Sequence, residues 1–168
     1  MNKIITRRVK KVFSKVISQE QFGFLEGRKI HEAIGVAQEG LHTQKTTKRR
    51  GTTLKIDLSK AFDGVNWLYL RMLMTQLGFD YSFTKWIISC ILTPSFSILI
   101  KNSTSPFFGE ERGLFQGFPL SLLLFLVVEE GLSQALAHEK RKGSFKGMAL
   151  TNNIRLSHLL FVDDILIF

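Results

Sequence analysis

The 168-residue chain is long enough for one folded domain, and its 45% hydrophobic content excludes an intrinsically disordered protein. The net charge of +9 is concentrated in residues 1–50, which hold 12 Lys and Arg against 4 Asp and Glu, and this indicates either a nucleic-acid-binding region or a solvated charged face. A single cysteine excludes a disulfide framework or a cysteine zinc site, and the longest apolar run, residues 122–128, is too short to span a bilayer, so we expect an intracellular protein with no membrane partner.

The first 51 residues predict two helices and a loop. Apolar residues between positions 4 and 17 recur at helical spacing with basic residues between them, which predicts an amphipathic helix with a cationic outer face. A turn-rich segment around Gly23 and Gly27 separates this helix from a second one, predicted at about residues 29–42. The polar, basic stretch 43–51 has no periodicity and is predicted to be a surface loop.

From residue 52 the hydrophobic period changes to two. This predicts a strand with Leu54, Ile56 and Leu58 on one face and Asp57 on the other, near the end of the strand. Residues 65–77 return to helical spacing, and the glycine that follows them is suited to end a helix. One more helix is predicted over residues 83–91, before the next proline.

The second half of the chain predicts a strand pair, a buried helix and a final hairpin. The segment "SFSILIKN" and the stretch after Pro106 predict paired strands joined by the turn "NSTS". Residues 119–142 form a largely apolar helical pattern, which predicts a buried helix with proline in its first turn. Residues 154–168 predict two strands joined by a two-residue turn that carries Asp163 and Asp164.

Three carboxylates, those of Asp57, Asp163 and Asp164, carry the sharpest chemical signal. Adjacent ionised carboxylates in an apolar setting repel one another and lose hydration, so they need a compensating cation or a protonated partner. Mg²⁺ binds such oxygen ligands together with substrate phosphates, and two such ions can organise phosphoryl transfer. Taken alone, the Asp pair more often marks an ordinary turn, because Asp tolerates turn geometry.

Four motifs together carry a family resemblance. They are "VISQEQFGFLEGRKIHEAI" at 16–34, "LKIDLSKAFDGVNW" at 54–67, "RGLFQGFPLS" within 112–133 and "FVDD" within 158–168. In this order they resemble the reverse transcriptase of LINE-type (non-LTR) retrotransposons, especially those of plants, and the last three correspond to the motifs A, B and C of that family. The resemblance covers nearly the whole chain.

The resemblance implies an α+β fold, the palm of a right-hand polymerase, in which helices back an antiparallel sheet. Residues 51–168 would form the palm and residues 1–50 a partial, mostly helical and basic part of the fingers. The family segment that holds an arginine implicated in triphosphate binding is expected to lie before residue 1. The thumb, the primer grip and an endonuclease domain are likewise expected to be absent from this chain.

The resemblance also implies roles for individual residues. The carboxylates of Asp57, Asp163 and Asp164 and the backbone carbonyl of Leu58 would hold two Mg²⁺ ions, for which Mn²⁺ is a substitute. Phe62 would match the aromatic that crowds the sugar 2′ position, and Gln116 with Gly117 would lie beside the incoming nucleotide. Basic side chains, with solvated loop positions as the alternative, would contact template or primer phosphates; they are Arg28, Lys48, Arg49 and Arg50.

Several of these residues have simpler structural interpretations. Phe62 also fits a core aromatic, and Gln116 a side chain that closes its own loop. Asp63 is interpreted as a helix N-terminal residue favoured by the helix dipole rather than as a metal ligand. The four histidines show no metal-ligand spacing and are expected at the surface or the edge of the core.

Some positions depart from the family pattern. Phe115 replaces a basic residue, Phe118 an aspartate, Leu122 a proline and Gly64 an arginine. The change at Phe118 is the most informative physically, because an aspartate before Pro119 would cap the long helix and phenylalanine cannot accept its free amide bonds. The loss of such a cap costs about 1 kcal/mol.

The sequence thus predicts a domain of an RNA-directed DNA polymerase, whose partners in the complete family enzyme are an RNA template, a DNA primer and deoxynucleoside triphosphates. Two alternatives stay open. One is a noncatalytic nucleic-acid-binding remnant that relies on the basic first 50 residues, and the other is an inert retroelement relic. No motif indicates a protein partner, and the sequence does not decide between nucleus and cytoplasm.

Overall fold

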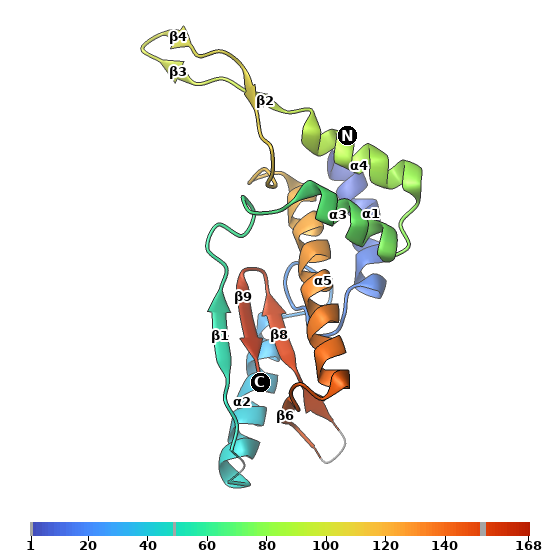
Figure 1. Ribbon diagram of the computed structural model, residues 1–168, viewed down its shortest axis with the longest axis vertical. Helices are drawn as coiled ribbons and strands as arrows, with labels where there is room; N and C mark the ends of the chain where they lie inside the picture. Colours follow the sequence, from blue (N-terminus) through green and yellow to red (C-terminus); the bar gives the residue numbers. More distant parts are fainter. Residues whose placement is uncertain (1, 49, 152–153) are drawn as a thin grey trace.

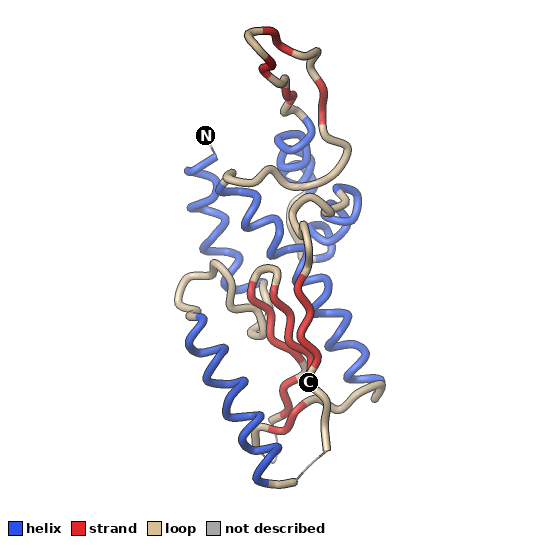
Figure 2. The backbone as a smooth tube through the Cα atoms, turned by 90° about the vertical axis from the view of Figure 1, so that its left-hand side faces the viewer, coloured by secondary structure: helices blue, strands red, loops and turns tan. Residues whose placement is uncertain are grey.

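The computed structural model describes residues 2–48, 50–151 and 154–168, with the backbone alone for residues 2–4. A three-stranded antiparallel sheet lies between two helices, α2 on one face and α5 on the other (Figure 2). The helices are α1 (Asn2–Val16), α2 (Ile30–Thr46), α3 (Trp67–Gln76), α4 (Tyr81–Leu92) and α5 (Pro119–Lys142). The strands are β1 (Leu54–Asp57), β2 (Ser95–Phe96), β3 (Leu99–Ile100), β4 (Ser103–Thr104), β5 (Phe108–Gly109), β6 (Met148–Ala149), β7 (Arg155–Leu156), β8 (His158–Phe161) and β9 (Asp164–Ile167).

The main sheet has the order β1–β9–β8. The chain turns back directly from β8 to β9, and β1 joins from the other side, with Leu54 opposite Ile167 and Asp57 opposite Asp164. In β8 and β9 Leu159, Leu160 and Ile165 are buried. The last strand is therefore the central one, paired on both sides, so the carboxylates of the hairpin are carried by the best-supported part of the sheet.

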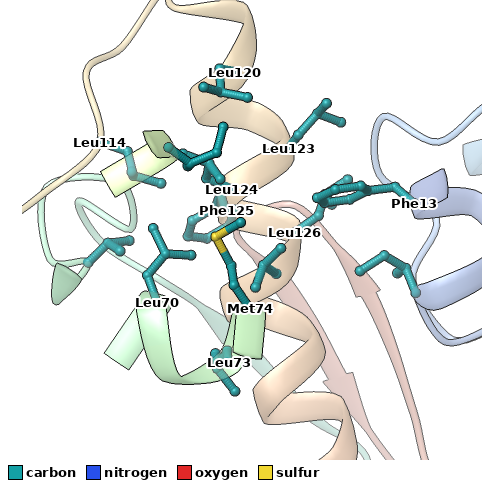
Figure 3. Close-up of a cluster of buried hydrophobic side chains, with 14 of the residues drawn as sticks. Phe13, Leu70, Leu73, Met74, Leu114, Leu120, Leu123, Leu124, Phe125 and Leu126 are labelled. Carbon is teal, nitrogen blue, oxygen red and sulfur yellow. The ribbon is translucent and has the colours of Figure 1, made fainter. Parts of the chain in front are cut away.

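Helix α5 is the centre of the hydrophobic core (Figure 3). Its contacts are with α1, α3 and β8. The side chain of Leu126 is fully buried, and that of Phe125 stacks on Phe62 with ring centroids 4.5 Å apart. Other core residues labelled in Figure 3 are Phe13, Leu70, Leu73, Met74, Leu114, Leu120, Leu123 and Leu124. The prediction of a buried helix over residues 119–142 is confirmed.

Among the described residues, α5 is also the one helix long and apolar enough to cross a bilayer by length and composition. Of its most apolar window, 56% is buried inside the fold. A core helix passes the same test, since burial in protein and burial in lipid select the same side chains.

The helix ends follow local sequence signals. Gly78 has a φ of 83°, and the amide of Phe79 donates to the carbonyl of Met74, so α3 ends as predicted. Asp80 caps α4 by accepting from two amides. Phe118 is the N-cap of α5 and makes no side-chain cap bond, which confirms the missing cap.

Two expectations about helix ends were wrong. Helix α2 runs to Thr46, whereas residues 43–51 were predicted to be a loop; the Thr46 hydroxyl bonds to carbonyls of its own helix, which satisfies this polar side chain without leaving the helix. Asp63 does not open α3. The cap is Asn66, whose side-chain oxygen accepts from the amide of Tyr69, while Asp63 lies in the turn before it.

Residues 95–109 form an arm that projects from the body of the fold (Figure 1). Strand β2 pairs with β5 and β3 with β4, so the predicted strand pairing is confirmed. The predicted position of the turn was wrong. Lys101 and Asn102 make the turn with φ values of 46° and 66°, a geometry that suits the right-handed twist of a two-residue hairpin, and Ser103 already belongs to β4.

The first 50 residues pack against the rest of the fold. The side chains of Phe13, Ile17 and Leu25 belong to the core around α5, and α2 lies against β6 and β8. The division into fingers and palm at residue 50 stays a prediction, and both helices of the first part pack directly on elements of the second.

Candidate active site

The three candidate carboxylates meet at one end of the main sheet. Asp57 is the last residue of β1 and lies opposite Asp164, the first residue of β9. The next residue, Leu58, donates its amide hydrogen to the carbonyl of Asp163 over 3.0 Å. The two residues of the turn are Val162 and Asp163, so the expectation that both aspartates lie in the turn was wrong: the strand already includes Asp164.

The two hairpin carboxylates, those of Asp163 and Asp164, border different cavities. The Asp164 carboxylate forms an ion pair with Lys55, with 2.9 Å between Oδ1 and Nζ. Both residues line the groove between α2 and the sheet. Asp163 is exposed and borders a different cavity, on the side of α5. The hydrogen bond and charge of Asp164, with further contributions from Asp57 and Asp163, raise the pKa of Lys55. Lys55 is therefore a cation that pairs directly with the carboxylate cluster.

The cavity beside Asp163 gathers the predicted nucleotide-binding residues. It has a volume of about 400 Å³, and its walls include Leu58, Phe62, Gln116 and Gly117. Sequence reasoning missed three further lining residues, of which Lys60 supplies the positive charge; the others are Ala61 and Ser121. Lys60 could have been noticed from the sequence, because it is a basic residue three positions after Asp57, in the segment where the strand gives way to a turn.

Phe62 and Gln116 have structural contacts as well. The ring of Phe62 is half-buried against Phe125, so it belongs to the edge of the core and to the cavity wall at once. Gln116 donates to Asp63 at 3.5 Å, which links the two loops that frame the cavity. Gly117, with a φ of 89°, turns the chain between Gln116 and α5 in a conformation that glycine adopts without strain.

The donor set suits a hard divalent ion. Asp57 and Asp163 are both exposed carboxylates, and Leu58, which follows Asp57, is joined to Asp163 by its backbone amide. In the described residues no three His, Cys, Asp or Glu side chains converge as a complete protein cage for a metal. Mg²⁺ does not require one, because it is commonly bound by one or two carboxylates together with water and substrate phosphates.

A buried carboxyl group lies behind the hairpin and was missed by the sequence reasoning. The Glu129 side chain is 2% exposed, and its Oε2 accepts from Gln21 Nε2 over 2.6 Å. Burial raises the pKa of Glu129 to about 9, against the opposing effect of the Gln21 bond, and the charge of Asp163 raises it further. The available signal was "VVEE", two carboxyl groups inside an apolar helix.

A chain of buried polar groups continues along α5. The hydroxyl groups of Ser18 and Ser133 lie 2.7 Å apart, and Ser133 lies 2.8 Å from Nε2 of His158. His158 is fully buried, so its expected place at the surface or the edge of the core was wrong. Burial lowers its pKa, which keeps the ring neutral inside the fold.

The predicted phosphate-contacting residues are placed differently from one another. Arg28 points inward: its guanidinium donates to the carbonyls of Ile17, Ser18 and Gln21, and burial lowers its pKa. These donors stabilise the loop between α1 and α2, and a contact of Arg28 with template or primer phosphates stays a prediction. Lys48 and Arg50 are exposed after α2. Arg49 lies outside the described residues.

Comparison with known proteins agrees with this geometry. The family model described as "Reverse transcriptase (RNA-dependent DNA polymerase)" matches residues 1–168. The chain belongs to the reverse transcriptase family.

Relatives of the chain are retrotransposon proteins. It is 29% identical over 129 residues to the "Retrovirus-related Pol polyprotein from type-1 retrotransposable element R2" of Popillia japonica, and 28% identical over 128 residues to the "Transposon TX1 uncharacterized 149 kDa protein" of Xenopus laevis. These matches cover 75% and 76% of this reverse transcriptase chain, but 20% and 10% of the relatives. An Arabidopsis thaliana mitochondrial protein, AtMg01250, is 44% identical over 54 residues, which are 32% of this chain and 44% of that protein.

Solved telomerase structures share the fold. An apo telomerase from Candida tropicalis superposes with a TM-score of 0.68 over 98% of this chain and 34% of that one, at 13% identity. A Candida albicans telomerase in complex with a fragment of telomeric RNA gives 0.66 over 98% of this chain and 29% of that one, at 12% identity. The α+β polymerase palm expected from the motifs is confirmed as the fold.

Proposed function

We propose that this reverse transcriptase domain transfers deoxynucleotides to the 3′ hydroxyl of a DNA primer on an RNA template. One observation carries the proposal: the cavity beside Asp163 brings together residues from three separate segments. These are Leu58 and Phe62 after β1, the stretch from Gln116 and Gly117 into the first turn of α5 at Leu122, and Asp163 in the hairpin turn. A cavity with an exposed carboxylate, an amide and an apolar wall suits a nucleotide with its triphosphate, sugar and base.

Asp57, Asp163 and Asp164, with the Leu58 carbonyl, would hold two Mg²⁺ ions, and Mn²⁺ is the expected substitute. Bound there, such ions stabilise charge on the attacking and leaving oxygens of phosphoryl transfer. The protein contributes position: the register of β1 against β9 keeps Asp57 next to the hairpin, and the bond from Leu58 to Asp163 fixes the turn. Lys55 offsets part of the negative charge of the cluster when no ion is bound.

The cavity wall would select and align the nucleotide. The half-buried ring of Phe62, supported from behind by Phe125, would crowd a 2′ hydroxyl and favour deoxynucleotides. Gln116 and Gly117 would contact the incoming nucleotide from the other side, and Lys60 would face its phosphates. The cavity of about 400 Å³, with exposed Asp163 at its border, would also leave room for the primer end.

Primer extension tests the proposal. The purified chain is incubated with Mg²⁺, an RNA template and a DNA primer, beside Asp57→Asn and Asp163→Asn, which keep side-chain size and remove the charge. We expect extension by the unmutated chain and a loss of at least about 1000-fold in both variants, in line with the removal of essential electrostatic groups. Asp80→Asn, a matched change at the α4 cap and outside the residues that line the cavity, controls for folding. No extension by the unmutated chain would refute catalysis by this chain.

A second candidate function is RNA binding without catalysis. Basic side chains are exposed along α1, namely Arg7, Arg8, Lys11 and Lys15. Such a face binds phosphates through counterion release, so RNA affinity should fall steeply as salt rises. RNA binding with this salt dependence, together with no extension, would favour this second function.

A further inference from the structure

The pair formed by Gln21 and Glu129 lies behind the hairpin turn and takes no part in the proposed chemistry. Gln21 is fully buried between α1 and α2, Glu129 is 2% exposed on α5, and 108 positions separate them in the chain. The amide of Gln21 donates to Glu129 over 2.6 Å. The second oxygen of Glu129 has no hydrogen-bond partner among the described residues. Burial of a polar pair away from water costs desolvation free energy. Such a pair is therefore expected to have a structural effect that offsets this cost.

Gln21 is connected to the hairpin turn through Gly23. Its side-chain oxygen accepts from the amide of Gly23 over 2.7 Å, which fixes the backbone there. A Cβ atom at Gly23 would lie 3.1 Å from Cγ2 of Val162 and 3.2 Å from its backbone nitrogen. Gly23 therefore touches the first residue of the hairpin turn directly, and a larger residue would push the turn away.

The same segment is attached to β8 by its backbone. The amide of Phe22 donates to the carbonyl of Leu160, and the amide of Leu160 donates to the carbonyl of Glu20, each over 2.9 Å. Gln21 itself makes a parallel bridge with Leu160. The loop thus extends the sheet edge next to the turn, with the Gln21 side chain directed into the protein toward Glu129.

The turn needs such support because it is strained. Val162 has a φ of 58°, and a β-branched residue in the left-handed region is a conformational outlier. Strain of this kind costs about 1–3 kcal/mol and persists only where the surroundings impose it. Asp163 follows immediately, so the conformation at Val162 sets the direction in which the Asp163 carboxylate leaves the turn.

We propose that Gln21 and Glu129 are positioning residues, which hold Gly23 against Val162 and so keep the Asp163 carboxylate in the nucleotide cavity. The inference rests on the proposed function for its catalytic consequence, but its structural part is independent of activity. Neither residue touches substrate; both act through the loop and the turn.

Amide hydrogen exchange tests the proposal in the full chain. The Leu58 amide reports the bond from β1 to Asp163, and the Leu77 amide, bonded within α3, reports stability away from the turn. We compare Glu129→Leu, which has no acceptor, with Glu129→Gln, which retains an acceptor for Gln21. Leu70→Ala, at a fully buried position in α3, is the matched control for general destabilisation.

In Glu129→Leu we expect exchange at Leu58 to rise by about tenfold or more relative to exchange at Leu77, the effect of losing one buried hydrogen bond. In Glu129→Gln the ratio should stay within about threefold of the unmutated chain. Leu70→Ala should accelerate Leu77 at least as much as Leu58. If Glu129→Leu does not fold, Gln21→Met removes the same bond from the other partner, together with the acceptor of the Gly23 amide, and should raise the ratio at least as much.

An unchanged ratio in both Glu129→Leu and Gln21→Met would overturn the proposal, and so would an equal loss in Glu129→Gln. Primer extension separates this inference from the proposed function. If the unmutated chain extends a primer, Glu129→Leu should lower kcat with little change in the KM for the nucleotide. If the unmutated chain does not extend a primer, the proposed function fails, while hydrogen exchange still decides the positioning role.

Discussion

Replacement of Glu129 by glutamine should change how stability depends on pH. The ordinary pKa of this carboxyl group is 4.5, and burial in the fold raises it to about 9. Between pH 6 and 8 the group is then protonated in the folded chain and ionised in the unfolded chain, so folding takes up about one proton. Since the folded pKa is the higher one, the stabilisation is complete below the unfolded pKa and is lost as pH rises toward the folded pKa.

The magnitude follows from linkage. One proton taken up on folding lowers the unfolding free energy by about 1.4 kcal/mol for each pH unit, or about 3 kcal/mol between pH 6 and 8. Glutamine has no proton to lose, so Glu129→Gln should lack this contribution to the slope. This slope requires only that the pKa of Glu129 in the unfolded chain lies below pH 6 and that its pKa in the folded chain lies above pH 8.

Urea unfolding followed by circular dichroism at pH 6, 7 and 8 measures the effect. Glu139→Gln is the matched control on the same helix: the hydrogen bond from Ser144 and then that from Lys142 lower the pKa of Glu139. The stability due to a lowered pKa is lost only in acid, so this control should keep the slope of the unmutated chain between pH 6 and 8. If Glu129→Gln keeps that slope too, Glu129 is not protonated in the fold and the reasoning is refuted.

Four further outcomes are expected from the packing and the caps, one of them for a control substitution. Asp80→Ala should lower the unfolding free energy by about 1 kcal/mol in urea titrations, because the amides of Ser82 and Phe83 lose their cap; no change would contradict the capping role. Gly131→Ala should cost about 1–3 kcal/mol, because the new Cβ would lie 2.6 Å from the Tyr69 hydroxyl and 2.8 Å from Leu73. Gly35→Ala, a matched helical change with open space around it, should instead stabilise by about 0.5–1 kcal/mol, and equal effects at the two glycines would contradict the packing argument. Leu126→Ala, at a fully buried position, should cost about 2–5 kcal/mol in the same titrations, and a cost below 1 kcal/mol would contradict its place in the core.

Local signals predicted most of the elements and the family. Helix ends at Gly78 and Gly143 could be predicted because glycine occupies the left-handed conformation there at no steric cost, with φ values of 83° and 84°. The unsatisfied start of α5 at Phe118 follows from residue chemistry alone. The position of a turn was harder to predict, as Lys101 shows, because hairpin pairing overrides the local preference for a Ser- and Thr-rich turn.

The direction of side chains could not be predicted in the same way. The sequence predicted that Arg28 contacts a phosphate, whereas in the fold its guanidinium group donates hydrogen bonds to three backbone carbonyl groups. Glu129 was given no role in the sequence analysis, yet its carboxyl group accepts a hydrogen bond from Gln21, 108 positions away. Such contacts depend on which segments the fold brings together, and no local periodicity records that.

The sequence by itself determined which residues carry the candidate chemistry. Asp57, Asp163 and Asp164 were identified by their residue types, their spacing and the order of their motifs. Only the tertiary structure decided how these carboxylates are divided, with Asp163 at the cavity beside α5 and Asp164 paired with Lys55 in the groove beside α2. The physical reason is strand pairing: Asp164 is the first residue of β9 and is held opposite Asp57 of β1, whereas Asp163 lies in the turn before β9, where the left-handed conformation of Val162 directs the chain.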